Sequence, residues 1–277
     1  MHAARKIQTA EIPCISTQKI SRWHDGKRSD EQDNLVVEIP VALEFNGISH
    51  AVMLATPCDL ESFALGFALS EGIIKSHGEF FGAEVAKSAL GITVHCDISS
   101  AAFLRLKQRR RNLTGRTGCG LCGVESLEQV IRDLPRVPQT APLAIAAMRV
   151  ALKELATLQP LNQLTGGMHA AAWSDAQGNL QLVCEDVGRH NALDKLIGLM
   201  TQYQLDFQHG FLVITSRASV EMVQKAATVG ISNLIAISAP TALAVLTAKD
   251  TGMTLIAFAR GDHFVVYAHG ENIQTEK

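Results

Sequence analysis

The chain has 277 residues, of which 47% are hydrophobic, so it can bury one large core or the cores of two smaller lobes. Its net charge of −2 excludes nucleic-acid binding driven by overall charge. The first residues lack the apolar core of a secretory signal, and no apolar run reaches the roughly 18 residues of a membrane span. We therefore expect a cytoplasmic protein that neither inserts into a membrane nor binds nucleic acid.

The first half of the chain predicts a loosely ordered tail followed by an α+β lobe. Residues 1–33 are polar and weakly patterned, as is typical of a tail. Strand-forming residues at 35–44 and 48–55 flank Asn46-Gly47, a strong type I′ turn signal, and together they predict a β-hairpin. A buried helix that ends near Gly72 is predicted by apolar residues at helical spacing, namely Leu60, Phe63, Ala64, Phe67 and Ala68.

The same lobe is predicted to end in a basic helix. Residues 92–98 indicate a further strand, and Ser99-Ser100 can cap a helix that continues to about Asn112. Prolines then break regular structure, which places the boundary between an N-terminal lobe at 34–134 and a C-terminal lobe at 135–277.

The C-terminal lobe alternates strands and helices. Short apolar runs predict strands at 211–215, 234–237, 253–259 and 263–268, with helices after the first two. Strands that alternate with helices become parallel neighbours, and Arg260-Gly261-Asp262 suits a hairpin turn before the last strand. The sequence therefore predicts an α/β sheet with one antiparallel strand at its end.

Polar segments follow two of these strands, at 215–219 and 238–241. Ligands of such sheets gather beyond the carboxyl ends of the strands, where hydroxyls and free amides at helix N-termini favour phosphate. Ordinary helix capping explains the same residues. The chain contains neither G-x-x-x-x-G-K-[ST] nor G-x-G-x-x-G, so ATP hydrolysis and a Rossmann dinucleotide site are not supported.

Histidines supply two further candidates. Asp186 can cap a helix that places His190 and Asp194 one turn apart on one face, a spacing that could bind a metal or transfer a proton. More often such a histidine is a hydrogen-bonded surface residue. His169 lies among small residues and could line a pocket.

The most distinctive motif is the thiol loop, residues 115–123, in which Cys119 and Cys122 stand among glycines. No carboxylate occurs between Asp97 and Glu125, whereas six basic residues fall in that window: Arg105, Lys107, Arg109, Arg110, Arg111 and Arg116. Positive charge favours the thiolate, which is the nucleophile and the metal ligand. Glycine lets another macromolecule approach the backbone closely. The loop is typical of an accessible, electropositive thiol site.

Metal binding by the thiol loop is a weaker interpretation. A structural zinc site needs two further ligands at suitable spacing, and none follows. Zinc deaminases use H-x-E before P-C-x-x-C, and His77-Gly78-Glu79 matches the first element, but Gly118 replaces the proline. No metal is therefore expected. The other cysteines are expected to be structural or inert, without disulfide pairing: Cys14, Cys58, Cys96 and Cys184.

Several separated motifs together resemble the FdhD/NarQ family over most of the chain. They are residues 41–43 with 46–50, 63–67 with 70–73, the thiol loop, 185–190, 216–219 and 221–225. The resemblance implies a C-terminal three-layer α/β sheet of the cytidine-deaminase-like type with a smaller N-terminal α+β lobe. It also implies a sulfur carrier, a sulfurtransferase needed for formate dehydrogenase activity. Sulfur would arrive as persulfide from a cysteine desulfurase and pass to molybdenum bis(molybdopterin guanine dinucleotide), with GDP as a mimic of that client cofactor.

The resemblance also implies site residues. Cys119 matches the persulfide-carrying cysteine and Cys122 its neighbour. The cofactor-binding candidates are Phe258, Ala259, Arg260, Gly261, Asp262, His263, Ser216, Arg217, Ser219 and His190. Asp262 departs from the expected pattern, because positive charge would be expected there.

Two other functions stay open on the sequence. Cys119 and Cys122 could cycle through a disulfide as a dithiol oxidoreductase, or the protein could be a non-catalytic chaperone that only binds the cofactor and formate dehydrogenase. The apolar C-terminal sheet is compatible with a homodimer.

Overall fold

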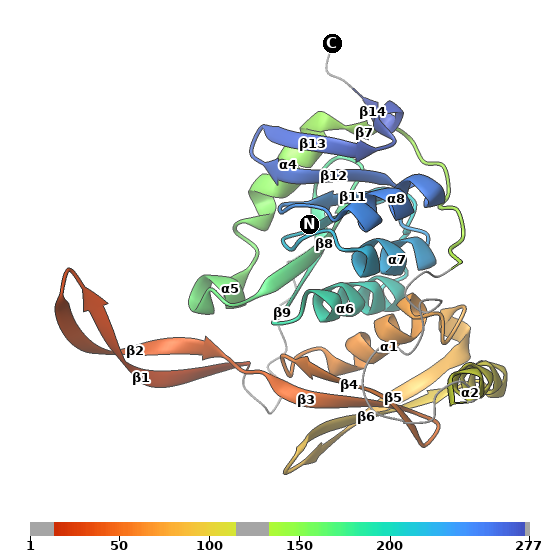
Figure 1. The fold of residues 1–277 in the computed structure, drawn as a ribbon, viewed down its shortest axis with the longest axis horizontal. Helices are drawn as coiled ribbons and strands as arrows, with labels where there is room; N and C mark the ends of the chain where they lie inside the picture. Colours follow the sequence, from red (N-terminus) through yellow and green to blue (C-terminus); the bar gives the residue numbers. More distant parts are fainter. Residues whose placement is uncertain (1–13, 115–132, 275–277) are drawn as a thin grey trace.

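The computed structural model describes residues 14–114 and 133–274, which form a mixed α/β fold with several sheets (Figure 1). A two-stranded hairpin projects from a four-stranded sheet, and a six-stranded sheet with helices on both faces makes up most of the remainder. The thiol loop, with Cys119 and Cys122, lies outside the described residues. None of the described helices has the length and apolar character needed to cross a membrane.

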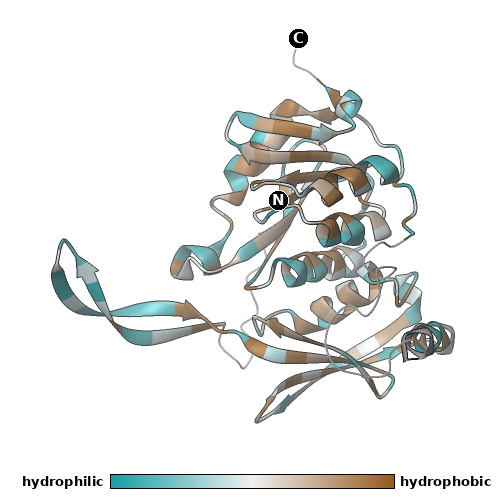
Figure 2. Cartoon of the chain, viewed as in Figure 1, coloured by the Kyte–Doolittle hydropathy of each residue, from teal (hydrophilic) through white to brown (hydrophobic). Residues whose placement is uncertain are grey.

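The projecting hairpin consists of β1 (Ile15–His24) and β2 (Lys27–Val36), so the prediction of a loose tail is wrong for this segment. Its surface is mostly hydrophilic (Figure 2). Polar pairs join the strands, since Arg22 Nε lies 2.9 Å from Glu31 Oε2. Strands paired in this way lack the alternation of apolar and polar residues from which a strand is predicted. The overlooked signal was Asp25-Gly26 at its tip, where both residues have positive φ.

The N-terminal sheet has the strand order β4-β3-β6-β5, with strands β3 (Ile39–Phe45), β4 (Ile48–Ala55), β5 (Phe80–Ser88) and β6 (Gly91–Ile98). The predicted hairpin of β3 and β4 is confirmed, with φ of 45° at Asn46 and 78° at Gly47. The predicted helices are also confirmed as α1 (Leu60–Ser70) and α2 (Ser100–Thr114). Strand β5 was not predicted. A short η1 helix (His77–Glu79) precedes it.

The C-terminal sheet has the order β13-β12-β11-β10-β8-β9. Its strands are β8 (His169–Asp175), β9 (Leu180–Asp186), β10 (Gly210–Ile214), β11 (Asn233–Ala236), β12 (Thr254–Arg260) and β13 (His263–Ala268). Strands β10, β11 and β12 are parallel and β13 is antiparallel, as predicted. The prediction missed the antiparallel hairpin of β8 and β9 at the other end, whose buried small residues give little strand signal.

Helices cover both faces of this sheet because successive strand residues point to opposite sides. One face packs on α4 (Ile145–Leu155), and the other packs on α6 (Arg189–Gln202), α7 (Val220–Thr228) and α8 (Ala242–Thr251). Helix α8 begins after Thr241, whose hydroxyl caps it by accepting from the Ala244 amide at 3.2 Å. The smaller elements are α5 (Pro160–Thr165), η2 (Gly270–Asn272), and the paired strands β7 (Leu143–Ala144) and β14 (Ile273–Gln274).

Helix α1 of the N-terminal lobe packs closely against α6 of the C-terminal lobe. A Cβ atom on Gly66 would overlap the main-chain oxygen of Asp194, and one on Gly198 would overlap that of Ser62. Glycine at both positions therefore lets the two helix backbones approach. This contact fixes how the lobes meet, while the boundary placed at residue 134 stays a prediction.

Candidate functional site

Most of the predicted site residues in the described part of the chain gather at one edge of the six-stranded sheet. Strands β9, β10, β11 and β12 run in the same direction, so their carboxyl ends meet there. His169 begins β8 at this edge, opposite Asp186 at the end of β9. The N-termini of α6 and α7 follow β9 and β10 directly. We call this region the carboxyl edge.

The loops after β10 and β11 are fastened to each other at the carboxyl edge. The Ala218 amide donates to Ala239 O at 3.1 Å, and the Thr241 amide donates to Ala218 O at 3.0 Å. Ser216 is buried and donates to Arg217 O, so its hydroxyl is engaged with the main chain. Arg217 is exposed. Among these predicted phosphate contacts, Arg217 is therefore the one that faces solvent.

Buried polar atoms without partners accumulate at the same edge. In residues 14–114 and 133–274, five buried side-chain atoms have no hydrogen-bond partner, and three of them are Arg189 Nε, His190 Nε2 and Ser219 Oγ. Arg189 opens α6, and Ser219 occupies the N-cap position of α7 without a side-chain capping bond. The Ser219 hydroxyl lies near enough to Glu221 to help lower the pKa of that carboxyl, but outside hydrogen-bond geometry. Leaving such atoms unpaired is costly. The arrangement suits a ligand that supplies both acceptors and donors.

The histidines of the carboxyl edge are held neutral. Burial lowers the pKa of His190 to about 4, and the charges of Arg189 and Lys225 act in the same direction. Burial and Arg189 also lower the pKa of His169. A neutral imidazole presents one donor and one acceptor. Arg189, which the sequence did not single out, therefore supplies a positive charge that acts on both uncharged rings.

Asp194 does not join His190 in a metal or proton-transfer pair. Lys225 Nζ lies 2.9 Å from both Asp194 carboxylate oxygens and 2.8 Å from Glu71 Oε1, and Ser70 Oγ donates to Asp194 at 2.6 Å. Burial opposes the charge of Lys225, but Asp194 and Glu71 outweigh it and raise the lysine pKa. This cluster links α1, α6 and α7, and we call it the Lys225 network. Its side chains are committed to packing the lobes together.

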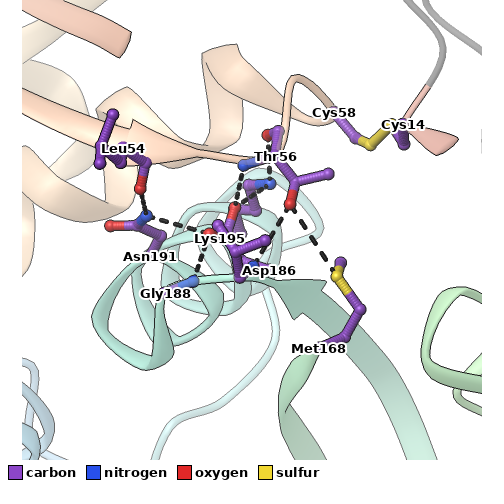
Figure 3. A network of polar contacts seen from close by, with 10 residues as sticks. Cys14, Leu54, Thr56, Cys58, Met168, Asp186, Gly188, Asn191 and Lys195 are labelled. Carbon is purple, nitrogen blue, oxygen red and sulfur yellow. Dashed lines mark hydrogen bonds and ion pairs between the residues drawn. A yellow bond between two sulfur atoms is a disulfide. The ribbon is translucent and has the colours of Figure 1, made fainter. Parts of the chain in front are cut away.

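Asp186 holds a second buried network between the lobes (Figure 3). Its carboxylate accepts hydrogen bonds from the Thr56 amide at 3.1 Å and from Asn191 Nδ2 at 3.0 Å, and it lies 2.6 Å from Lys195 Nζ. Asn191 also donates to Leu54 O at 2.8 Å. We call this cluster the Asp186 network. The motif at 185–190 thus serves the lobe contact through Asp186 and the carboxyl edge through Arg189 and His190.

The predicted cofactor segment at 258–263 comprises the end of β12, the two-residue turn after it and the first residue of β13. Phe258 has a φ of 52° and is 44% exposed, whereas Ala259 is buried in the core and offers only its main chain. Asp262, the residue that departed from the expected pattern, lies 2.9 Å from Arg149 of α4. Arg149 therefore places a cation beside this turn, which the sequence alone did not indicate.

Four cysteines fall within the described residues. Cys96 and Cys184 are buried, and burial raises the pKa of Cys96 to about 12, so its thiolate is suppressed at neutral pH. Cys14 and Cys58 form a disulfide, which corrects the expectation that they are unpaired. Tertiary structure brings them together across 44 residues, a proximity that spacing does not reveal.

Of the deaminase pattern, the structure describes only His77-Gly78-Glu79, because Cys119 and Cys122 lie outside the described residues. Glu79 of the H-x-E pattern accepts from the Lys75 amide at 2.7 Å and from Arg105 Nη2 at 2.6 Å. Within the described residues, no group of three or more histidine, cysteine, aspartate or glutamate side chains is placed to hold a metal. The carboxylate that would move protons is instead tied to a cation and a main-chain amide.

Comparison with known proteins gives one consistent result. Residues 36–274 match the model of the FdhD/NarQ family. A protein of Variovorax paradoxus named sulfur carrier protein FdhD is 55% identical over 87% of this chain and 86% of its own length. A Cupriavidus necator protein of the same name is 51% identical over 96% and 93%. A crystal structure of a proposed formate dehydrogenase accessory protein from Desulfotalea psychrophila has a TM-score of 0.73 and 24% identity, covering 95% of this chain and 100% of that one.

Proposed function

Since the chain belongs to the FdhD/NarQ family, we propose that it is a sulfur carrier protein for formate dehydrogenase maturation. One observation carries the proposal: about half of the residues are identical to those of relatives named sulfur carrier protein FdhD, over most of both chains. In this proposal a cysteine desulfurase supplies persulfide sulfur. The protein passes it to molybdenum bis(molybdopterin guanine dinucleotide), its substrate, which formate dehydrogenase then receives.

The proposed chemistry is carried by Cys119. Its thiolate attacks the outer sulfur of the donor persulfide, forming a persulfide on Cys119 and releasing the donor cysteine as thiolate. When the cofactor accepts that outer sulfur as a neutral atom, Cys119 regains its thiolate. Arg116 and the basic residues at 107–111 favour the charged sulfur, whereas Arg105 is paired with Glu79. Cys122 follows Cys119 by three positions in the sequence. In this proposal the protein is a sulfurtransferase that is regenerated in each cycle.

We propose that the guanine nucleotide of the cofactor binds at the carboxyl edge. Three residues there have buried atoms that lack hydrogen-bond partners within the described chain, namely Arg189, His190 and Ser219. Arg217, two residues before Ser219 in the sequence, is exposed. Phe258 supplies a half-exposed aromatic ring for a base. Helices on both faces of parallel strands support assigning this lobe to the cytidine-deaminase-like type. The cytoplasmic location and the homodimer stay predictions.

Mass spectrometry of the intact protein after incubation with a cysteine desulfurase and cysteine tests the proposal. We expect the mass of one added sulfur atom, located on Cys119 by peptide mapping and removed by a thiol reductant. Cys119→Ser should abolish both the added sulfur and the support of formate dehydrogenase activity. Cys122→Ser, the matched control in the same loop, should lose less of both.

The same experiment separates the competing functions. Loss of two hydrogen masses that peptide mapping assigns to Cys119 and Cys122, without added sulfur, would identify a dithiol oxidoreductase. Full formate dehydrogenase activity with both cysteines replaced would identify a chaperone, and either result would overturn the sulfur carrier proposal.

A further inference from the structure

The Cys14–Cys58 disulfide joins the base of the β1–β2 hairpin to the segment between β4 and α1 (Figure 3). The two Cα atoms are 6.5 Å apart. Cys14 O accepts a hydrogen bond from the Val37 amide at 2.9 Å, which closes the hairpin at the residue that carries the sulfur. The bond therefore fastens both strands of the hairpin to residue 58.

The segment that carries Cys58 also holds the contact between the lobes. Thr56, two residues earlier, is fully buried. Its carbonyl oxygen accepts a hydrogen bond from Lys195 Nζ at 3.0 Å. Its amide donates to Asp186, and its carbonyl oxygen also accepts from the Cys58 amide at 2.8 Å. A single hydrogen-bonded turn, from Thr56 to Cys58, therefore connects the Cys58 sulfur to the Asp186 network.

We propose that Cys14 and Cys58 form a reversible redox site, separate from Cys119 and Cys122, whose disulfide fixes the hairpin against the lobe junction. The reductant is a dithiol. Its thiolate attacks Cys14 Sγ, releasing Cys58 as thiolate, and its second thiol then displaces Cys14, so the dithiol becomes a disulfide and both protein cysteines become thiols. The site does not depend on the proposed sulfur carrier function.

The positions of the two sulfurs suit this order of attack. Cys14 is half-buried, so an external thiolate can reach it, whereas Cys58 is only 4% exposed. The predicted cytoplasmic location also favours a transient bond over a permanent one, because thiol systems there reduce accessible disulfides.

Reduction is expected to loosen the hairpin. The hairpin has a mostly polar surface and no core of its own, so its order depends on the ties at its base and on the contact of β2 with α5. Without the disulfide, the main-chain hydrogen bond from the Val37 amide still holds Cys14. The reduced protein should therefore open more often at residues 14–37 and at the turn after Thr56.

Peptide mapping tests the bond and its reversibility: the full chain is incubated in its native state with or without dithiothreitol, freed of the reductant in acid, and then alkylated in denaturant. The Cys14 and Cys58 peptides should be cross-linked without reductant and should each carry one alkyl group after treatment of the native protein with dithiothreitol. Alkylation of both without dithiothreitol, or a cross-link that persists after it, would overturn the proposal. Mapping identifies each cysteine, so Cys119 and Cys122 do not interfere.

Hydrogen exchange then tests the structural consequence. Dithiothreitol should speed exchange of the Val37 and Thr56 amides about tenfold or more, in line with the constraint that a bridge of this loop length places on open states. The Cys14→Ser/Cys58→Ser variant should show the fast rates with or without dithiothreitol. Equal rates in oxidised and reduced wild-type protein would refute the coupling, and that comparison decides the matter even if the variant does not fold.

Discussion

The lobe junction and the carboxyl edge are both rich in polar side chains, but they differ in how those side chains are paired. At the junction, Lys225 contacts Asp194 and Glu71, and Lys195 contacts Asp186. At the carboxyl edge, buried atoms of Arg189, His190 and Ser219 have no partner among the described residues. Paired buried charges hold the two lobes in place, whereas the unpaired atoms are available to a ligand.

This difference in pairing divides residues that are neighbours within one sequence motif. In the segment 185–195, Asp186, Asp194 and Lys195 are enclosed in the junction, while Arg189 and His190 face the carboxyl edge. A helix that begins at Arg189 turns successive residues in different directions, so a single sequence motif serves both regions. Mutations in this motif should therefore divide into those that affect stability and those that affect binding.

Lys225→Met should have the largest effect on the junction. It leaves Asp194 buried without a counter-charge, and breaking a buried pair in this way costs about 3–5 kcal/mol of unfolding free energy. Guanidinium denaturation measures the loss. Lys249→Met, on the exposed face of α8, is the matched control and should change stability by no more than about 0.5 kcal/mol. A loss in Lys225→Met no larger than in the control would show that the network contributes little.

Gly66→Ala tests the close approach of α1 and α6. The added Cβ would overlap the main-chain oxygen of Asp194, so the helices must separate and the junction should lose about 3 kcal/mol. The same denaturation experiment measures this loss. Gly78→Ala is the control, because the nearest atom would lie 3.9 Å from its new Cβ. An unchanged midpoint in Gly66→Ala would mean that the helices are not held so closely.

Acid should lower the free energy of unfolding through the partly buried ring of His190. Its folded pKa, about 4, lies below the ordinary value of 6.5, so only the unfolded chain takes up the proton between these values. Stability contributed by the neutral ring is present above pH 6.5 and is lost as the pH falls toward 4. The free energy of unfolding should fall between pH 7 and pH 4.5 in the wild-type protein, and this fall should be about 2 kcal/mol smaller in His190→Gln. Denaturation at both pH values measures the difference. An equal pH dependence in both proteins would place His190 in solvent.

Arg189→Gln should have the smallest effect on stability but a specific effect on binding at the carboxyl edge. Removing the guanidinium should weaken binding of GDP, measured by calorimetry, about tenfold. Arg22→Gln on the hairpin removes an equal charge far from this edge and is the control. If both variants bind GDP equally well, the nucleotide does not contact Arg189.

Local patterns in the sequence predicted a large part of this fold. The Asn46-Gly47 hairpin, α1, α2 and the parallel strands β10 to β12 follow from turn residues and periodicity, which act over a few residues. The polar hairpin of β1 and β2 escaped because its strands are stabilised by cross-strand polar pairs rather than by an apolar face. The candidate cofactor residues were named from family motifs, and their contacts with a ligand stay predictions.

The sequence by itself determined the local elements, the thiol loop and the motifs that identify the family, because each element and each motif consists of residues that are close along the chain. Only the tertiary structure decided which polar residues are paired. Lys225 meets Glu71 and Asp194, and Cys14 meets Cys58, across separations that no local pattern encodes. Burial and pairing depend on what the rest of the chain packs around a side chain, and this is why neighbouring residues of one motif can stabilise the fold or face a ligand.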